Sequence, residues 1–469
     1  MKQVRNLKIF LGALLFSAPM FGMNPSMSID GYTGATTVSK QKSTVGTVKA
    51  KAKRKASKAV LVTSLSKSVA KVASDSIDFD TYFTDQTLRL DYVFAGDINA
   101  QSIYLSNLYR LPGWAGRRHH LSDLPLAGTY QLTVKDVATK KVIYRYSFSS
   151  LFIEWLDTEE ARHVPRAFPN TYLIPYPKEK VEVSIAVREK SGQYTEKIHH
   201  EIDPTDILIR PLGEHKVPAH EVIQQAGPSD QCIDLAFLPE GYTEAEMDTF
   251  VADVKKCCES LFSYEPFKSN KDRFNVIAVK TPSRESGVSQ PKLKDWKDNA
   301  FGSHFDTFYS DRYLTSSAIP EINNALAGIP YEQIIVLGNC NRYGGGGVYN
   351  SFTLCDAHDV LTPTIVVHEF GHTFGGLADE YYYATEQVVE VYPRNVEPWE
   401  PNITTKVDFA SKWKDLYDKG VVGLYEGGGY SQKGVWRPMP DCRMNTNKAT
   451  EFCPVCQRGL QRIIDFYTR

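Results

Sequence analysis

The sequence predicts a multidomain protein with both α and β structure, in which an antiparallel β-sandwich precedes an α/β domain. At 469 residues, the chain is longer than one ordinary domain. Between residues 77 and 215, runs such as "TLRLDYVF", "TYQLTV" and "VEVSIAV" alternate apolar and polar residues with a period of two. That period, with turn residues between the runs, indicates antiparallel strands, and we expect a β-sandwich over residues 77–215.

The pattern changes in residues 216–469, where strand-like and helical segments alternate. The runs "CIDLAFL", "RFNVIAV" and "YEQIIVLGN" are apolar enough to be buried strands. The segment "TEAEMDTFVADVKKCCESLF" has the spacing of an amphipathic helix, and Thr243 with Glu246 forms a capping box at its start. Strands that alternate with helices predict an α/β domain.

The first 22 residues have the order of charge and hydrophobicity that is typical of a secretory signal peptide. Lys2, Arg5 and Lys8 precede an apolar run from Ile9 to Phe16, which is too short to span a bilayer. The alternative is a single N-terminal anchor. No other apolar run approaches membrane length. We therefore expect an exported protein (periplasmic, cell-surface or secreted) with no transmembrane segment beyond the signal.

Residues 23–76 are predicted to be a linker rich in Ser, Thr and Lys. From Gly31 to Ser74 the chain has no acidic residue, and its centre reads "VKAKAKRKASKAV". This composition favours a flexible tether, and the alternative is association with an anionic cell surface or glycan. The whole chain has a net charge of −1, which argues against nucleic acid as its partner.

The cysteines all lie at residue 232 or beyond. There are eight: Cys232, Cys257, Cys258, Cys340, Cys355, Cys442, Cys453 and Cys456. Sequence alone does not determine their pairing. A zinc knuckle around the CxxC of Cys453 and Cys456 would need a fourth ligand, and none is evident nearby. We therefore expect a disulfide between Cys442 and the CxxC pair.

The segment "PTIVVHEFGHTFGGLADEYYY", residues 363–383, contains the candidate metal-binding and catalytic residues. Pro363 suits the first turn of a helix, with Thr362 or Thr364 near the cap. Residues four apart share one face of a helix, so His368 and His372 can bind the same metal ion. A two-histidine site with a third ligand leaves one position open, as catalytic zinc sites do. Zinc lowers the pKa of a bound water, and Glu369 beside the histidines can accept its proton as general base.

The third ligand is expected just after the helix. Ten residues beyond the first histidine, where such a ligand often stands, is Ala378, which cannot bind metal. Gly375 and Gly376 allow a sharp turn, and Asp379 follows them. This order is similar to that of the metzincins, which end the helix at a glycine and add the third ligand soon after. Asp379 is our candidate and Glu380 the alternative; a later glutamate, Glu386 or Glu390, fits the early turn less well.

Two flanking segments fit such a site. The four glycines from Gly344 to Gly347 could form an edge strand beside which an extended peptide adds, or an ordinary flexible hairpin. Met439 and Met444 lie downstream. The metzincin pattern includes a methionine turn beneath the metal, and Met444 is the better candidate, with a core methionine as the alternative.

The motif "HEFGHTFGGLADEY" closely resembles that of the IgA-specific metallo-endopeptidase family, secreted zinc peptidases of gut bacteria. Further segments are similar to the same family: "DYVFAGD", "SFSSLFIEW", "NTYLIPYPK", "LAFLPEGYT", "RYLT" and "FCPVC". The resemblance runs from about residue 77 to the end of the chain. It implies a metzincin-like zinc-peptidase domain with one catalytic zinc, held by His368, His372 and Asp379, and Glu369 as general base. It also implies a protein or peptide substrate, with immunoglobulin A as a candidate.

Two other functions remain open from the sequence. A surface-binding protein could carry an inactive peptidase-like domain, but the intact His368, Glu369 and His372 count against it. A zinc amidohydrolase could act on a non-peptide amide, whereas the glycine-rich segment favours an extended peptide.

Overall fold

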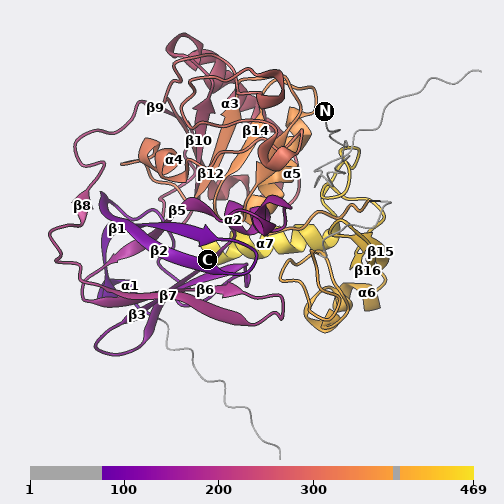
Figure 1. The fold of residues 1–469 in the computed structure, drawn as a ribbon, viewed down its shortest axis with the longest axis horizontal. Helices are drawn as coiled ribbons and strands as arrows, with labels where there is room; N and C mark the ends of the chain where they lie inside the picture. The colour runs from indigo at the N-terminus through magenta and orange to yellow at the C-terminus, as the bar shows by residue number, and fades with distance from the viewer. Residues whose placement is uncertain (1–76, 384–390) are drawn as a thin grey trace, which may run out of the picture. The chain divides into compact units, whose positions relative to one another are not determined.

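The computed structural model describes residues 77–383 and 391–469 (Figure 1). These residues belong to one compact unit. The predicted signal peptide and linker lie outside the described residues, as do Glu386 and Glu390. The boundary that the sequence predicts near residue 215 stays a prediction.

Two four-stranded sheets occupy residues 83–211, in the strand orders β5-β1-β2-β8 and β4-β3-β6-β7. All their neighbouring strands are antiparallel except β2 and β8, which are parallel. The strands are β1 Phe83–Gly96, β2 Gln101–Pro112, β3 Tyr130–Asp136, β4 Val142–Phe148, β5 Arg166–Pro177, β6 Val181–Arg188, β7 Tyr194–Ile202 and β8 Arg210–Pro211.

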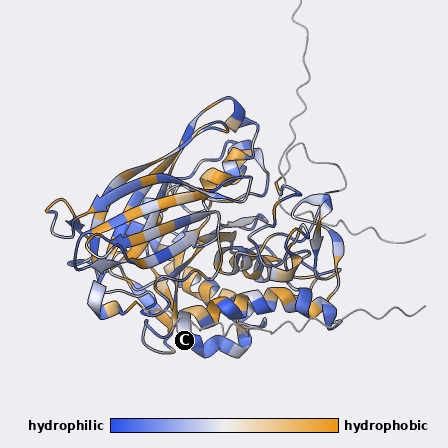
Figure 2. Cartoon of the chain, turned by 90° about the horizontal axis from the view of Figure 1, so that it is seen from below, coloured by the Kyte–Doolittle hydropathy of each residue, from blue (hydrophilic) through white to orange (hydrophobic). Residues whose placement is uncertain are grey.

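The two sheets contribute to one apolar core. Leu90 and Phe94 of β1 are fully buried in the same cluster as Leu132 of β3 and Ile185 of β6. The rings of Phe94 and Tyr130 are 5.0 Å apart across the sheets. Strand β3 alternates buried and half-buried residues along its length, and Figure 2 shows hydrophobic and hydrophilic residues alternating along the strands. The predicted period-two strands are confirmed, and their classification as a sandwich stays a prediction.

A six-stranded mixed sheet forms the centre of the C-terminal region, in the order β13-β14-β12-β10-β11-β9. Its four inner strands are parallel and both edge strands are antiparallel to their neighbours. The strands are β9 His220–Gln224, β10 Ile233–Glu240, β11 Phe274–Val279, β12 Gln333–Gly338, β13 Gly345–Gly347 and β14 Thr353–Asp356. The inner strands include the three that the sequence predicts, so the mixed α/β character is confirmed.

The α-helices are short, apart from three. They are α1 Phe79–Tyr82, α2 Leu151–Leu156, α3 Met247–Leu261, α4 Ile319–Ala325, α5 Thr362–Gly375, α6 Lys414–Asp418 and α7 Pro454–Thr468. The predicted capping box of Thr243 and Glu246 is present, but a 3₁₀ turn, Glu244–Glu246, separates it from α3. The other 3₁₀ turns are Glu160–Arg162, Lys268–Arg273, Pro291–Leu293, Thr307–Tyr309 and Phe409–Ser411. A hairpin, β15 Tyr425–Gly428 and β16 Ser431–Arg437, precedes α7.

The long helices and the central sheet share a second core. Phe250 of α3, Phe370 of α5 and Leu460 of α7 are fully buried in it. Gly375 lets α5 and α7 approach closely, because an added Cβ would lie 2.5 Å from the Leu460 side chain. None of the helices within the described ranges is both long and apolar enough to cross a membrane.

The N-terminal sheets contact the loop that follows β13. The amide of Asn350 donates to the carbonyl of Ser147 at 2.8 Å, and the backbone N–H of Ser149 donates to Tyr349 O at 2.9 Å. The guanidinium of Arg117 lies 4.9 Å from the ring centroid of Phe466 in α7. Residues predicted to belong to two domains are thus joined by direct hydrogen bonds and a cation–π contact.

Strand β13 lies so close to α5 that it tolerates no side chain at Gly347. A Cβ there would stand 2.2 Å from the carbonyl oxygen of Glu369 and 2.9 Å from Thr373 Oγ1. We predict that Gly347→Ala forces β13 away from α5 and lowers the free energy of unfolding by roughly 1–3 kcal/mol. Gly428→Ala is the control, because its nearest neighbours would be 3.7 Å away. Equal losses in denaturant titrations of both variants would contradict the close packing.

Candidate metal centre and active site

Helix α5 carries the histidine motif and ends where the sequence predicts. Gly375 is its last residue, and Gly376 follows in the left-handed conformation with φ 56°. The start of the helix is also as predicted, because Pro363 lies in its first turn and Thr362 is next to the N-cap, Leu361; no side chain caps the helix. The hydroxyl of Thr362 instead donates to Asp356 Oδ1 at 2.6 Å.

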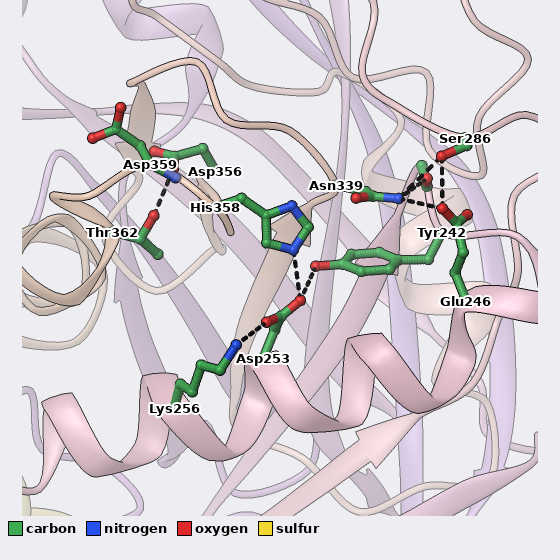
Figure 3. A network of polar contacts seen from close by, with 11 residues as sticks. Tyr242, Glu246, Asp253, Lys256, Ser286, Asn339, Asp356, His358, Asp359 and Thr362 are labelled. Atoms are coloured by element: carbon green, nitrogen blue, oxygen red, sulfur yellow. Dashed lines mark hydrogen bonds and ion pairs between the residues drawn. The ribbon is translucent and has the colours of Figure 1, made fainter.

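A polar network holds the segment that leads into α5 (Figure 3). The buried carboxylate of Asp253 in α3 accepts from Tyr242 at 3.0 Å and lies 2.8 Å from Nε2 of His358. Lys256 adds an ion pair to the same carboxylate at 3.0 Å. Because His358 lies just before α5, this network ties the start of the helix to α3.

The structure brings His368, His372 and Asp379 together. The two Nε2 atoms are 3.2 Å apart, and Asp379 Oδ1 lies 3.1 Å from that of His368 and 3.3 Å from that of His372. Glu369 stands beside them, with a carboxylate oxygen within 4.8 Å of the histidine nitrogens. The four predicted site residues therefore form one group.

Backbone carbonyls set the tautomer of both histidines. Nδ1 of His368 lies 2.9 Å from the carbonyl of Arg443, and Nδ1 of His372 lies 2.6 Å from the carbonyl of Leu377. Carbonyl oxygens only accept, so each Nδ1 carries the proton. In the neutral rings each Nε2 then presents a lone pair to the other and to Asp379 Oδ1. Three electron-pair donors thus face one point, which favours a cation there.

Burial and the close approach of acidic and imidazole groups shift the pKa values of the site. Burial opposes a charge on His372, but Asp379 outweighs it and raises the pKa of His372 to about 9. Burial likewise opposes ionisation of Asp379, but the two histidines hold the pKa of its carboxyl far below the ordinary range. Burial raises the pKa of Glu369, with a smaller opposing effect of the histidines. The site therefore attracts positive charge, either as protons or as a metal ion.

The spacing of the three atoms suits zinc. Two ligand atoms at 2.0–2.1 Å from a tetrahedral zinc ion are about 3.3 Å apart, and the three observed separations are 3.1, 3.2 and 3.3 Å. Asp379 Oδ1 is buried without a hydrogen-bond donor, while Oδ2 accepts from the hydroxyl of Tyr430 at 2.5 Å. Tyr430 thus turns Oδ1 towards the histidines. The residues fit a metal ion with three protein ligands.

Glu380, the alternative ligand, points elsewhere. Its Oε1 lies 3.1 Å from the sulfur of Cys456 and accepts from Asn402 at 3.0 Å.

The disulfide predicted between Cys442 and the CxxC pair is wrong, because the cysteines are free and Sγ of Cys442 is 3.8 Å from that of Cys456. A disulfide requires about 2.05 Å. The expectation that no fourth ligand lies near these cysteines is also wrong, since Glu380 is remote from them in sequence but close in space.

The turn around Met444 lies against α5. An added Cβ on Gly371 would stand 2.8 Å from the sulfur of fully buried Met444. The carbonyl of Met444 accepts from the backbone N–H of Glu380 at 2.7 Å, and the carbonyl of Arg443 contacts His368. This turn therefore positions both a histidine and the segment after the helix. Its equivalence to a metzincin methionine turn stays a prediction.

A cavity of about 300 Å³ opens at the site. Glu369, His372 and Asp379 line it together with Gly346 and Gly347 of the edge strand β13. Residues of the N-terminal region, among them Thr129, Glu154 and Arg188, also line it.

The sequence analysis missed Glu154, Tyr313 and Tyr430. Tyr313 donates a short hydrogen bond to Glu154, and Tyr430 orients Asp379. Each lies far along the chain from the histidine motif. No local spacing signals their role, so only the fold reveals them.

Two family profiles match the chain. The profile of the IgA Peptidase M64 family matches residues 222–421 and 418–464, more than half of the chain. The profile of the Peptidase M64 N-terminus matches residues 78–199. A search of curated proteins found no significant match. The chain belongs to the IgA peptidase M64 family, and it is therefore a metallopeptidase.

Proposed function

We propose that the protein is an exported zinc endopeptidase whose single catalytic ion is held by His368, His372 and Asp379. The observation that supports this assignment is the triangle of two imidazole nitrogens and one carboxylate oxygen with edges of 3.1–3.3 Å. Three protein ligands leave one coordination position for water or substrate. The open cavity beside the triangle is consistent with such a position.

In this proposal Glu369 is the general base. When bound, zinc supplies Lewis-acid chemistry, which activates water and polarises the scissile carbonyl. Glu369 takes the proton of the attacking water and passes it to the leaving nitrogen. Its raised pKa suits this exchange, because a base whose pKa is nearer neutrality also returns the proton readily.

The edge strand β13 offers a binding mode for an extended peptide. Within residues 77–383 and 391–469 its one strand neighbour is β14, apart from an isolated bridge between Gly345 and Tyr313. Gly346 and Gly347 line the cavity beside Glu369. A substrate backbone can pair with this edge while side chains reach the cavity wall, where Arg188 offers a positive charge and Glu154 a carboxyl group. Immunoglobulin A, for which the family is named, is the first protein substrate to test.

Export and surface association are part of the proposal and rest on the sequence. Residues 1–22 have the signal pattern, and the basic segment up to residue 76 would tether the enzyme or attach it to an anionic surface. The N-terminal sheets, which we take to form a β-sandwich, would complete one wall of the cleft.

We predict that Glu369→Gln lowers kcat by about 10²–10⁴-fold and leaves the zinc content unchanged, because Glu369 moves protons and does not bind the ion. The measurement is digestion of a broad peptide library and of immunoglobulin A, with elemental analysis of the same samples. Glu244→Gln, at an exposed position, is the control. Defined internal cleavages support an endopeptidase. Unchanged activity of Glu369→Gln would contradict its role, and no cleavage by wild type would favour an amidohydrolase or a binding protein.

We predict that Asp379→Ala weakens zinc binding by more than about 10²-fold, since it removes a ligand, and that Tyr430→Phe weakens it by about 10–100-fold. Tyr430→Phe removes only the hydroxyl that orients Asp379. Competition with a chelator of known affinity gives both values, and Asp408→Ala is an exposed control. Full affinity in Asp379→Ala would exclude it as a ligand.

The raised pKa of Glu154 predicts that the stability of the protein depends on pH. Burial raises the pKa of Glu154 to about 7, although the hydrogen bond from Tyr313 opposes the shift. The folded protein then binds more protons than the unfolded chain between about pH 4.5 and 7, so stability falls as pH rises through that window. Glu154→Gln should remove this decline. The melting temperature of Glu154→Gln minus that of wild type should therefore be roughly 2–4 °C larger at pH 8 than at pH 5.

The pH comparison is made by thermal unfolding with a chelator present, so that metal binding does not vary with pH. Glu159→Gln, at an exposed position nearby, is the control. Parallel melting profiles for wild type and Glu154→Gln across the range would show that Glu154 is ionised throughout.

A further inference from the structure

Four potential metal ligands meet in a second, separate cluster. They are the sulfurs of Cys442, Cys453 and Cys456 and a carboxylate oxygen of Glu380, and all four atoms lie within 4.8 Å of one another. All four residues are buried. The proposed catalytic site uses none of them.

Three segments far apart in the sequence supply these ligands. Glu380 follows the turn that ends α5, and Cys442 lies in the loop after β16. Cys453 is the N-cap of α7, and Cys456 lies within the first turn of that helix. The start of a helix favours thiolates, because its free N–H groups and its dipole stabilise negative charge. The backbone N–H of Cys453 also donates to Cys442 Sγ at 3.2 Å.

The separations match a tetrahedral zinc site. With Zn–S near 2.3 Å, two sulfur ligands are about 3.8 Å apart, and a sulfur and an oxygen ligand about 3.6 Å apart. The sulfurs of Cys442 and Cys456 are 3.8 Å apart. Glu380 Oε1 lies 3.1 Å from the sulfur of Cys456 and 3.9 Å from that of Cys453.

The Glu380 carboxylate provides a second, independent observation. Its side chain is fully buried, and its Oε2 has no hydrogen-bond partner. Among the described residues no lysine, arginine or histidine forms an ion pair with it, and its Oε1 accepts from the amide of Asn402 and lies near the sulfurs of Cys453 and Cys456. A buried polar atom without a partner is unfavourable. A metal ion in the cluster would give the carboxylate the missing partner.

We propose that Cys442, Cys453, Cys456 and Glu380 bind a second metal ion, a structural zinc with four protein ligands. Because all four positions are filled from the chain, the site has no place for substrate and is not catalytic. The second ion would hold in place the residues next to the proposed catalytic ligands. Glu380 is the neighbour of Asp379, and Cys442 is next to Arg443, whose carbonyl contacts His368. The second ion thus fixes both sides of the catalytic triangle.

The test separates the two sites by disabling the first. The double variant His368→Ala/His372→Ala lacks both catalytic histidines but keeps the cluster. After reconstitution with Co²⁺ it should hold about one ion per chain and show the near-ultraviolet charge-transfer absorption of cobalt–thiolate bonds. Adding Cys456→Ser should abolish that absorption, whereas adding Cys340→Ser should not. No step of this test depends on peptidase activity, so failure of the proposed function leaves it intact.

Two further measurements keep the test decisive. If Cys456→Ser does not fold, the nearly isosteric Glu380→Gln takes its place and should weaken cobalt binding by at least tenfold. Peptide mapping of the wild type, alkylated after denaturation in chelator without reductant, should show all three cysteines as free thiols. A disulfide between any two of them, or bound cobalt without thiolate absorption, would overturn the proposal.

Discussion

The active site depends on one electrostatic constraint: three electron-pair donors are held around a single point. Nε2 of His368, Nε2 of His372 and Oδ1 of Asp379 lie 3.1–3.3 Å from one another. Such an arrangement is repulsive unless positive charge, as protons or as a metal ion, lies among the three atoms. The surrounding residues keep the three atoms in place, and much of the local structure serves that purpose.

The fold meets this constraint with a hydrogen bond to the other polar atom of each of the three side chains. Carbonyls of Arg443 and Leu377 orient the histidine rings, and the hydroxyl of Tyr430 turns Asp379. The left-handed residue Gly376 turns the chain back so that Asp379 approaches the two histidines at the end of α5. Each of the three proposed ligands is therefore held by a hydrogen bond with a neighbouring group, and such bonds raise the affinity of metal sites. The cysteine cluster extends that support to Glu380 and the loop after β16.

Local sequence patterns were sufficient for the histidine helix and for several of the strands. The helical spacing of His368 and His372 and the glycines after them depend only on short-range geometry, so the helix, its end and Asp379 could be predicted. The alternating and apolar runs likewise predicted some strands of each large sheet, namely β1, β3, β6, β10, β11 and β12. The helix start could be predicted too, because Pro363 marks the first turn and Thr362 is the first helical residue.

Contacts between segments far apart in the chain could not be predicted from the sequence. The disulfide prediction failed because nothing in the spacing of Cys442, Cys453 and Cys456 shows that Glu380 approaches them. The same holds for Glu154 and Tyr313, which meet across the boundary predicted near residue 215. Pairings of this kind are set by packing of the sheets and helices, which no local pattern encodes.

The most direct test of the catalytic site is anomalous diffraction from crystals of the protein, recorded on both sides of the zinc absorption edge. Our account predicts a zinc peak between Nε2 of His368, Nε2 of His372 and Oδ1 of Asp379, at about 2.0–2.2 Å from each atom. A zinc-saturated crystal without a peak among these three atoms, or with Asp379 replaced by another ligand there, would contradict it.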